Sequence, residues 1–290
     1  MHPISTITKL LRTAHYLCCL AVNEDFSNPF KEWQGPKDKP IYVLGNGPSL
    51  KTLLADMAAD FAPYSESEFF VVNDFVHDSQ FALLRPRYYC LSDFLFFMNT
   101  IYSDRGHRAM QGLAEKVDWP MLLFIPWCQR KSSYLLPIGE NPNIRIVTFH
   151  HPTYWGIELL RHFLFKKGLG NGEFGTVILN AIYVSLMLGY KQIYVHGIEH
   201  TFFENLVVNR DNVLCTKVKH FYSEKEEWKP LLEHYPGPME NKPFTMAQFL
   251  KGKSILFQGH QIMNRFAKAC GASIYNCTPG SMVDAYERKG

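Results

Sequence analysis

The hydrophobic positions of this chain form short uninterrupted runs rather than an alternating pattern. The run from Pro40 to Leu44 is apolar throughout, which is typical of a strand buried on both faces, as in a parallel sheet. Similar runs recur along the chain at 69–72, 88–91, 121–125, 144–149, 192–195 and 274–275. Segments with helical character lie between most of these runs, for example 154–166, 175–188 and 254–270. This alternation predicts an α/β fold built on a doubly wound, Rossmann-like, mostly parallel sheet.

One long segment breaks this rhythm. Residues 200–243 carry charged residues, histidine, proline and glycine with little periodicity. Long irregular insertions in compact domains are commonly lids or binding subdomains. We therefore expect a ligand-binding α/β domain at 40–290 with an irregular lid insertion at about 200–243.

The N-terminal segment, residues 1–39, is expected to form a helix followed by a linker. Its apolar run from Ala14 to Val22 follows two basic residues, which is the outline of a signal peptide. However, the run contains His15 and two cysteines, and no small-residue cleavage site follows it. An amphipathic helix that packs on the domain or touches a membrane surface is the expectation.

Composition narrows the class of protein. The 290 residues are 47% hydrophobic and 20% charged, so a sizeable core is available and wholesale disorder is excluded. The formal net charge of +3 is too balanced to indicate nucleic acid binding. The seven cysteines form no CxxC pair, which favours reduced thiols and the cytoplasm over a disulfide framework. No run approaches the roughly 18 apolar residues that a membrane-spanning helix needs.

Polar residues follow several predicted strands, and the carboxyl ends of parallel strands are where ligands bind in open α/β sheets. Gly45-Asn46-Gly47-Pro48-Ser49 follows the first strand and opens a helix, with Ser49 as the expected N-cap. Such a turn lets a ligand approach the backbone and offers helix N–H groups to phosphate. It is neither GxGxxG nor a Walker loop. Gly175-Thr176 also opens a helix, and either binds an anion or only caps it.

The histidines and carboxylates do not form a metal signature. His196 and His200 are four residues apart, but across a strand end rather than along a helix, so zinc geometry is not implied. The chain contains no Asp-x-Asp pair, which many nucleoside-diphosphate sugar enzymes use to hold a divalent cation. We therefore expect no metal cofactor. His220, beside Phe221 and Tyr222 in the insertion, is a candidate general base because its pKa lies near 7.

Three segments together resemble a known family. They are Leu44-Gly45-Asn46-Gly47-Pro48-Ser49-Leu50-Lys51, Asn73-Asp74-Phe75, and Leu188-Gly189-Tyr190-Lys191-Gln192-Ile193-Tyr194 leading to Gly197-Ile198-Glu199. They resemble bacterial glycosyltransferase family 42, the CMP-sialic acid-dependent sialyltransferases. The same skeleton is similar to the related domain of motility-associated flagellin glycosyltransferases and to an archaeal pterin pyrophosphokinase. The resemblance covers roughly 40–290 and implies a GT-A-like, nucleotide-sugar-binding α/β domain whose lid closes on a CMP-activated sugar.

The resemblance also implies roles for individual residues. Asn46 and Asn73 match asparagines that contact the CMP donor, and Asp93 falls where the family has another. Gly175-Thr176 falls near the family's nucleotide-holding Thr-Ser-Gly, and His220 matches its catalytic base. The expected catalytic residues are His220, Tyr222 and His200. The expected donor contacts are Gly45, Asn46, Gly47, Ser49, Asn73, Ser92, Asp93, Gly175, Thr176 and Glu199.

Two departures from the family pattern bear on the donor. The family's lid tyrosines would fall near Thr201 and 203–207, where this chain has no tyrosine, so Tyr222 or His200 is left to substitute. The family's Gly-Ile-Asp is Gly197-Ile198-Glu199 here. The sugar is therefore expected to be a sialic acid-like or Kdo-like acid.

The sequence thus predicts an inverting, metal-independent glycosyltransferase. It would move a CMP-activated sugar acid to a glycan or glycolipid acceptor such as lipopolysaccharide or capsule. The alternatives left open are a nucleotide-dependent pyrophosphokinase-like enzyme and a non-catalytic scaffold of polysaccharide assembly. The expected location is the cytoplasm or the inner face of its membrane. A peripheral membrane contact and a homo-oligomer both stay open, and no nucleic acid partner is expected.

Overall fold

The central feature of the fold is a parallel sheet. The computed structural model describes residues 3–36, 38–98, 104–219, 226–232 and 242–289. Within these residues eight strands form one sheet in the order β11-β10-β6-β1-β2-β3-β4-β5, and every neighbouring pair is parallel. The strands are β1 (Ile41–Leu44), β2 (Glu68–Val72), β3 (Tyr88–Cys90), β4 (Met121–Pro126), β5 (Ile144–Phe149), β6 (Gln192–His196), β10 (Ser273–Asn276) and β11 (Glu287–Arg288). The predicted α/β fold class is confirmed.

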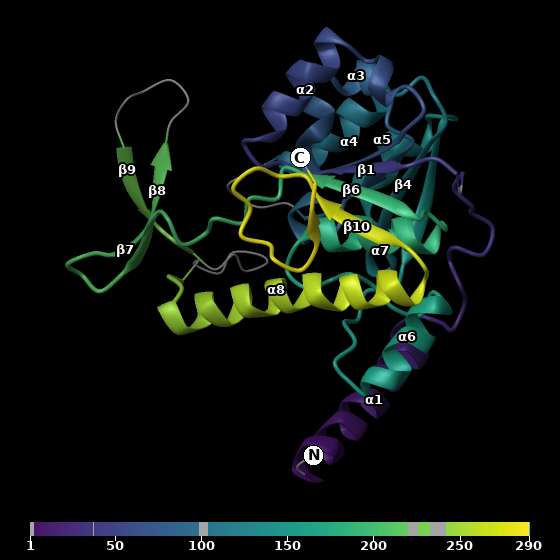
Figure 1. Ribbon diagram of the computed structural model, residues 1–290. Helices are drawn as coiled ribbons and strands as arrows, with labels where there is room; N and C mark the ends of the chain where they lie inside the picture. The colour runs from purple at the N-terminus through teal and green to yellow at the C-terminus, as the bar shows by residue number, and fades with distance from the viewer. Residues whose placement is uncertain (1–2, 37, 99–103, 220–225, 233–241, 290) are drawn as a thin grey trace.

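Helices cover both faces of this sheet, as Figure 1 shows. One face carries α2 (Leu50–Ala59), α3 (Phe81–Leu84), α4 (Arg105–Lys116) and α5 (Leu136–Gly139). The other carries α6 (Glu158–Lys166), α7 (Val177–Met187) and α8 (Met246–Ala269). Short 3₁₀ turns lie at Ala62–Tyr64, Asn73–His77, Phe94–Phe96, Trp127–Gln129 and Ser133–Leu135. Because both faces are covered, the strands are buried on both sides, which explains their uninterrupted apolar runs.

The helix α8 is longer than its apolar pattern predicts. It begins at Met246, eight residues before the expected start at 254. Thr245 and Gln248 form a capping box, in which the hydroxyl of Thr245 accepts from the Gln248 N–H at 3.2 Å and the Gln248 side chain accepts from the Thr245 N–H at 2.9 Å. This box fixes the start of the helix before its apolar periodicity becomes visible.

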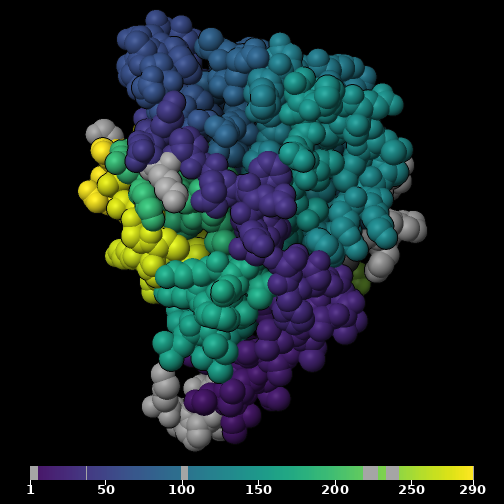
Figure 2. All heavy atoms as spheres, turned by 90° about the vertical axis from the view of Figure 1, so that its right-hand side faces the viewer, coloured from purple at the N-terminus to yellow at the C-terminus, as the bar shows by residue number. Residues whose placement is uncertain are grey.

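The N-terminal helix α1 (Pro3–Asn23) packs on the domain through its second half. Tyr16 and Leu20 are buried in the same cluster as the central strands, and the Tyr16 hydroxyl donates to the Leu169 carbonyl. Figure 2 shows this segment, in purple, lying against the teal segment that contains α6. Beyond α1, Glu24 forms a buried ion pair with His150 at the end of β5, with 2.6 Å between Oε2 and Nδ1. No helix in the described ranges is long and apolar enough to cross a membrane.

The insertion at 200–243 is not irregular in its described part, contrary to the sequence expectation. It contains an antiparallel sheet of β7 (Leu206–Val208), β8 (Leu214–Lys219) and β9 (Glu226–Pro230). The sheet projects from the body in Figure 1. Its pattern is hard to see in the sequence because only Leu214 and Cys215 are buried among the residues of these strands whose burial is described. An exposed ribbon needs no apolar face, so it leaves little hydrophobic periodicity.

Candidate functional site

The predicted site residues gather where the strand order reverses. The chain places β2 to β5 on one side of β1 and then returns to its other side with β6. The carboxyl ends of β1 and β6 therefore lie at the switch point of the strand order, where a crevice is the usual ligand site in open α/β sheets. Asn46 follows β1, Asn73 follows β2 and Glu199 follows β6.

The crevice has two joined lobes. The first lobe, about 400 Å³, is lined by Asn46, Gly47, Pro48, Val72, Asn73, Gly175, Thr176, Val177, Ile178, Gly197, Ile198, Glu199, His200, Thr201, Phe202, Lys253 and Leu256. The second lobe, about 460 Å³, is lined by Asn73, Ser92, Asp93, Phe94, Pro126, Cys128, Gln129, His151, Glu173, Gly175, Thr176 and Val177. Asn73 and the Gly175–Val177 turn line both lobes, so the start of α7 stands at their junction.

The glycines after β1 allow two loops to touch. The N–H of Gly47 donates to the Gly197 carbonyl at 3.0 Å. A Cβ on Gly45 would lie 2.4 Å from that same carbonyl oxygen, and a Cβ on Gly47 would lie 2.7 Å from it. Both positions therefore require glycine for a close approach of backbone to backbone. Gly45 itself does not line either lobe, whereas Gly47 lines the first.

Glu199 occupies the start of α2. Its Oε1 accepts a hydrogen bond from the Ser49 N–H at 2.7 Å, while its Oε2 is buried without a partner among the described residues. Ser49 stands at the N-cap position, but its side chain makes no capping hydrogen bond, contrary to expectation. A carboxylate is favourable at a helix N-terminus because it meets N–H groups and the positive end of the dipole. The expected phosphate position at α2 therefore already holds the anionic Glu199.

The start of α7 is open by comparison. Gly175 has φ +84°, which favours glycine, and no atom of the described residues would lie within 4 Å of a Cβ there. Thr176 is the N-cap of α7, and its side chain makes no capping hydrogen bond. The first N–H groups of this eleven-residue helix thus face the junction of the lobes without a side-chain acceptor in the described part of the chain. This is the better place for an anion.

The two asparagines at the strand ends differ in their surroundings. Asn46 donates through Nδ2 to the Val72 carbonyl over a long 3.4 Å. Asn73 has φ 55°, in the left-handed region, and its Oδ1 is buried without a partner among the described residues. The Tyr89 hydroxyl donates to the Asn73 carbonyl and accepts from the Val76 N–H at 3.0 Å, which holds this turn in place. Both amides keep hydrogen-bonding capacity for a ligand.

The second lobe is richer in carboxylates. Asp93 accepts from the Leu95 N–H at 3.0 Å and lies 3.8 Å from Arg105. Glu173 accepts from Asn180 Nδ2 at 2.7 Å, and burial raises the pKa of its carboxyl. The loop that carries Glu173 is tied to the end of β5 by Asn171, whose amide donates to the carbonyls of three successive residues, 150–152. Hydroxyl-rich ligands suit such a wall of acceptors.

A histidine and a lysine face the first lobe from the other side. Burial lowers the pKa of His200 to about 4, so its imidazole is neutral at pH 7. Its Nε2 lies 3.1 Å from Nε2 of His260. Lys253, on α8, holds its Nζ 3.7 Å from the centre of the Phe202 ring, and burial lowers the pKa of its ammonium group. Sequence reasoning missed Lys253 as a site residue.

The structure places most of the predicted donor residues in the crevice. Six of the ten line the first lobe, namely Asn46, Gly47, Asn73, Gly175, Thr176 and Glu199, and Ser92 and Asp93 line the second lobe only. Gly45 and Ser49 belong to the loop after β1 but line neither lobe. His220 and Tyr222 lie outside the described residues, so their catalytic roles stay predictions. Lys253, Glu173 and Gln129 also line the crevice, although the sequence did not suggest them and none belongs to a motif. His151, which follows a predicted strand and competes with His220 for the role of general base, lines the second lobe. Among the described residues no group of three or more His, Cys, Asp or Glu is arranged to hold a metal ion.

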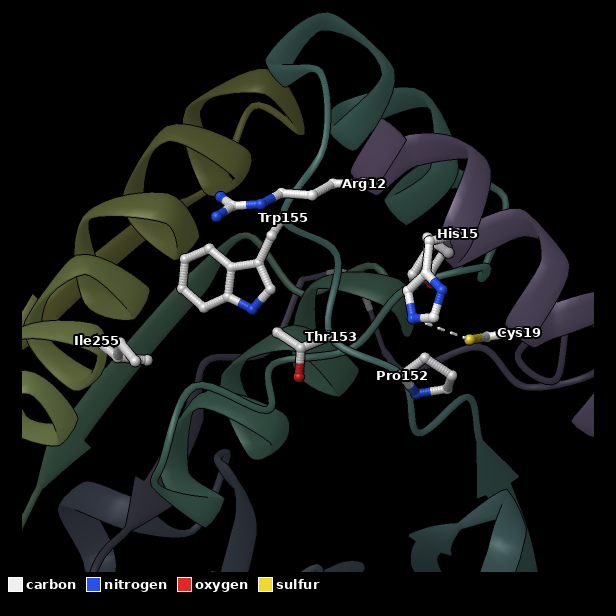
Figure 3. A pocket seen from close by; sticks show the side chains of 8 residues that line it. Arg12, His15, Cys19, Pro152, Thr153, Trp155 and Ile255 are labelled. Atoms are coloured by element: carbon white, nitrogen blue, oxygen red, sulfur yellow. Dashed lines mark hydrogen bonds between the residues drawn. The ribbon is translucent and has the colours of Figure 1, made fainter. Parts of the chain in front are cut away.

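A separate hollow of about 460 Å³ lies between α1, the loop after β5 and α8 (Figure 3). It is lined by Arg12, His15, Tyr16, Cys19, Pro152, Thr153, Trp155 and Ile255. His15 Nε2 lies 3.5 Å from the Cys19 sulfur, and Arg12 extends toward the Trp155 ring. None of the predicted site residues that the structure describes lines this hollow.

Comparisons with known proteins find similarity in structure but not in sequence. No family model matches the chain, and no curated protein matches it. Among solved structures, the chain is similar to the MAf glycosyltransferase from Magnetospirillum magneticum AMB-1, with 13% sequence identity and a TM-score of 0.47 over 89% of this chain. The chain spans about a third of that protein's length, with 35% covered. The resemblance to glycosyltransferase family 42 stays a prediction.

Proposed function

We propose that this protein is a glycosyltransferase that takes a sugar acid from a CMP donor. The observation that carries the proposal is the two-lobed crevice at the reversal of strand order. The asparagines and the Gly175-Thr176 turn that the family resemblance assigns to donor binding line it together. A nucleotide sugar has two unlike halves joined by phosphate, and a crevice with two lobes joined at a helix N-terminus fits that shape.

The contacts favour one orientation of the donor. Asn46 is exposed and lines the first lobe, so its amide can bond a ribose hydroxyl there. The phosphate would lie at the start of α7, in the first lobe, which Lys253 and His200 also line. The sugar would then occupy the second lobe, where Asp93 and Glu173 can accept hydrogen bonds from its hydroxyl groups.

This arrangement supplies the chemistry that transfer needs. An acceptor hydroxyl attacks the anomeric carbon, the new C–O bond forms as the bond to the phosphate oxygen breaks, and CMP leaves with the electron pair. A general base takes the hydroxyl proton, and attack opposite to the leaving group inverts the anomeric centre. Only one phosphate group leaves, so N–H donors and Lys253 can stabilise its charge without a metal. His220 is the proposed base on the family resemblance.

The family resemblance also suggests the reactants more closely. The proposed sugar is sialic acid-like or Kdo-like, because Glu199 replaces the family's aspartate. The proposed acceptor is a glycan or glycolipid of a bacterial surface polymer. A pyrophosphokinase would need carboxylates to hold magnesium, and Asp74 and Asp93 are the candidates. They are less suited to that role, because Arg105 already binds Asp74 at 2.8 Å and lies 3.8 Å from Asp93.

Calorimetry with CMP tests the proposal. CMP should bind the wild-type protein in EDTA, whereas ATP with Mg²⁺ should bind more weakly or not at all. Asn46→Ala should weaken CMP binding by about 1–3 kcal/mol, the scale for leaving a buried polar group without its partner. Asn23→Ala, an exposed asparagine at the end of α1, is the matched control and should leave affinity unchanged. Equal affinity in the parent and Asn46→Ala would remove the assignment of this crevice.

A further inference from the structure

A chain of three hydrogen-bonding side chains leads from the core to the first lobe. The Tyr286 hydroxyl lies 2.9 Å from Nδ1 of His260, and Nε2 of His260 lies 3.1 Å from Nε2 of His200. Tyr286 is 5% exposed and His260 is fully buried, whereas His200 is partly exposed and lines the lobe. These three hydrogen-bonded side chains come from the residue before β11, from α8 and from the loop after β6.

The positions of the protons follow from pairing each buried donor with an acceptor within hydrogen-bonding distance. Tyr286 has one hydroxyl proton and, among the described residues, one acceptor for it, Nδ1 of His260. A buried hydroxyl proton without an acceptor is costly, so Tyr286 donates. Burial lowers the pKa of His260 well below its usual value, so this imidazole is neutral and carries its single proton on Nε2.

The same assignment of donors and acceptors determines where His200 carries its proton. The Nε2–H of His260 needs an acceptor, and the atom within hydrogen-bonding distance is Nε2 of His200. His200 is also neutral at pH 7, so its own proton is on Nδ1. That nitrogen has no partner among the described residues. The opposite direction of donation would leave the Tyr286 proton buried without an acceptor in the described part of the chain.

We propose that Tyr286 and His260 are positioning residues that hold His200 in the Nδ1–H form, so that His200 donates a hydrogen bond to the phosphodiester of the ligand in the first lobe. His200 is then a neutral donor rather than a general base. Its backbone has φ 52°, in the left-handed region that favours glycine, which indicates a side chain held at a required place. This inference rests on the proposed function for the identity of the ligand, but the proton positions do not.

The donor role explains how a chain without the family's lid tyrosines can contact the leaving phosphate. A tyrosine hydroxyl and a neutral imidazole N–H are both uncharged groups that donate one hydrogen bond. Lys253 lines the same lobe and adds positive charge beside this donor. Together they fit a singly charged phosphodiester, which is the linkage in a CMP-sugar.

Nitrogen-15 spectra of histidine-labelled protein test the proton positions directly. Two-bond nitrogen–proton correlations should show His260 protonated on Nε2 and His200 protonated on Nδ1, with the His200 signals identified by their loss in His200→Asn. This result is expected whether or not CMP is the ligand. A spectrum in which His200 carries its proton on Nε2 overturns the inference even if CMP binds.

Substitutions at His200 test the donor role. His200→Leu should raise the Kd for CMP about tenfold or more, because a hydrogen bond to a charged group is lost. His200→Asn places an amide N–H near the position of Nδ1 and should recover most of that loss. Tyr286→Phe should mix the two forms of His200 in the spectrum and weaken CMP binding less than His200→Leu does.

The controls separate the two failures. If His200→Asn is as weak as His200→Leu while both keep the thermal midpoint of the parent, the donor role is wrong and the proposed function stands. If wild-type protein does not bind CMP at all, the proposed function fails, and the spectrum alone decides the proton positions. Should Tyr286→Phe unfold, the spectrum of the wild type still supports or overturns the inference.

Discussion

The Glu199 carboxylate accepts a hydrogen bond from the Ser49 N–H at 2.7 Å, although the two residues lie 150 positions apart. This contact joins the loop after β6 to the start of α2 beside the first lobe. It depends on Gly47, because a Cβ there would lie 1.6 Å from Glu199 Oε2. The two loops therefore form one rigid wall of the first lobe.

Alanine at either glycine of this wall should destabilise the fold. Gly45→Ala brings a Cβ to 2.4 Å from the Gly197 carbonyl oxygen, and backbone cannot move aside as a side chain can. We expect a loss of about 1–3 kcal/mol in the free energy of unfolding, which is typical of overpacking. Urea titration of the variant against the parent measures it.

The matched control is Gly252→Ala. Gly252 lies in α8 with no atom within 4 Å of its Cβ position. Alanine should therefore stabilise the protein there, by about 0.5–1 kcal/mol, since glycine is the poorer helix former. If Gly45→Ala proved as harmless as Gly252→Ala, the close contact of the two loops would be wrong.

Two substitutions at Asn73 separate its backbone role from its amide. Asn73→Gly keeps the left-handed backbone, φ 55°, and removes the amide, whereas Asn73→Ala removes the amide and strains the backbone. Both should weaken CMP binding, but only Asn73→Ala should also lose about 1–2 kcal/mol of stability. Calorimetry and thermal unfolding report the two effects. Unchanged CMP affinity in Asn73→Gly would exclude a donor contact by this side chain.

His196 should make the fold sensitive to acid. Burial lowers the pKa of its imidazole to about 4, and its Nε2 has no partner among the described residues. The unfolded chain binds a proton near pH 6.5 and the folded chain only near pH 4, so stability should fall as pH drops through that window. Between pH 7 and pH 4.5, the thermal midpoint of the parent should fall by more than the thermal midpoint of His196→Phe, which lacks the titrating imidazole. An equal drop in both proteins would contradict the prediction.

The Glu24–His150 pair should act in the opposite direction. Burial alone would lower the pKa of His150, but the hydrogen bonds from its ring to Glu24 and to the Ser27 carbonyl raise it overall. A raised pKa gives stability that is complete below pH 6.5 and is lost as pH rises through the folded-state value. Glu24→Gln should therefore remove part of the loss of stability seen on going from pH 6.5 to alkaline pH, as measured by urea midpoints.

Transfer should not require a divalent cation. The prediction rests on the absence of Asp-x-Asp from the sequence and on the single phosphate of a CMP donor. Activity of protein treated with EDTA should equal that of untreated protein. Loss of turnover in EDTA with recovery in Mg²⁺ or Mn²⁺ would favour a pyrophosphokinase or a diphosphate-sugar enzyme instead.

His220 remains the predicted general base. His220→Ala should lower kcat about 10²–10⁴-fold, the usual contribution of such a base, and leave CMP affinity nearly unchanged. The competing histidines are His150, His151, His200 and His234. If His220→Ala keeps near-parental kcat while one of these four loses about 10²-fold or more, the base has been assigned to the wrong residue.

The sequence was informative where one backbone rule governs position. Parallel strands end at the same edge of a sheet, so Asn46, Asn73 and Glu199 could be predicted to lie together from the strands that precede them. The contact between Glu199 and Ser49 could not be predicted, because it depends on the register of two loops. Lys253 was missed for a related reason, since helical periodicity does not reveal what lies opposite a helix.

Two other features carried local signals that apolar periodicity does not report. Asn209-Arg210-Asp211-Asn212 separates Val207-Val208 from Val213-Leu214, which is a hairpin pattern, and the Asn209 side chain accepts from the N–H groups of Asp211 and Val213. Thr245 and Gln248 mark the start of α8 in the same way. The turn residues thus predict strands where an irregular insertion was expected, and the cap residues predict the start of α8.

The antiparallel sheet β7–β9 leaves the domain after His200 and returns to it at Thr245, just before the helix that carries Lys253. The first point of attachment adjoins the first lobe, and in the described part of the insertion the strands pair only with one another. Such a segment behaves as a cassette: it can be exchanged between related chains without changing a strand of the parallel sheet. Chimeras joined at 200 and 245 should keep donor binding and take their acceptor preference from whichever chain supplies the cassette.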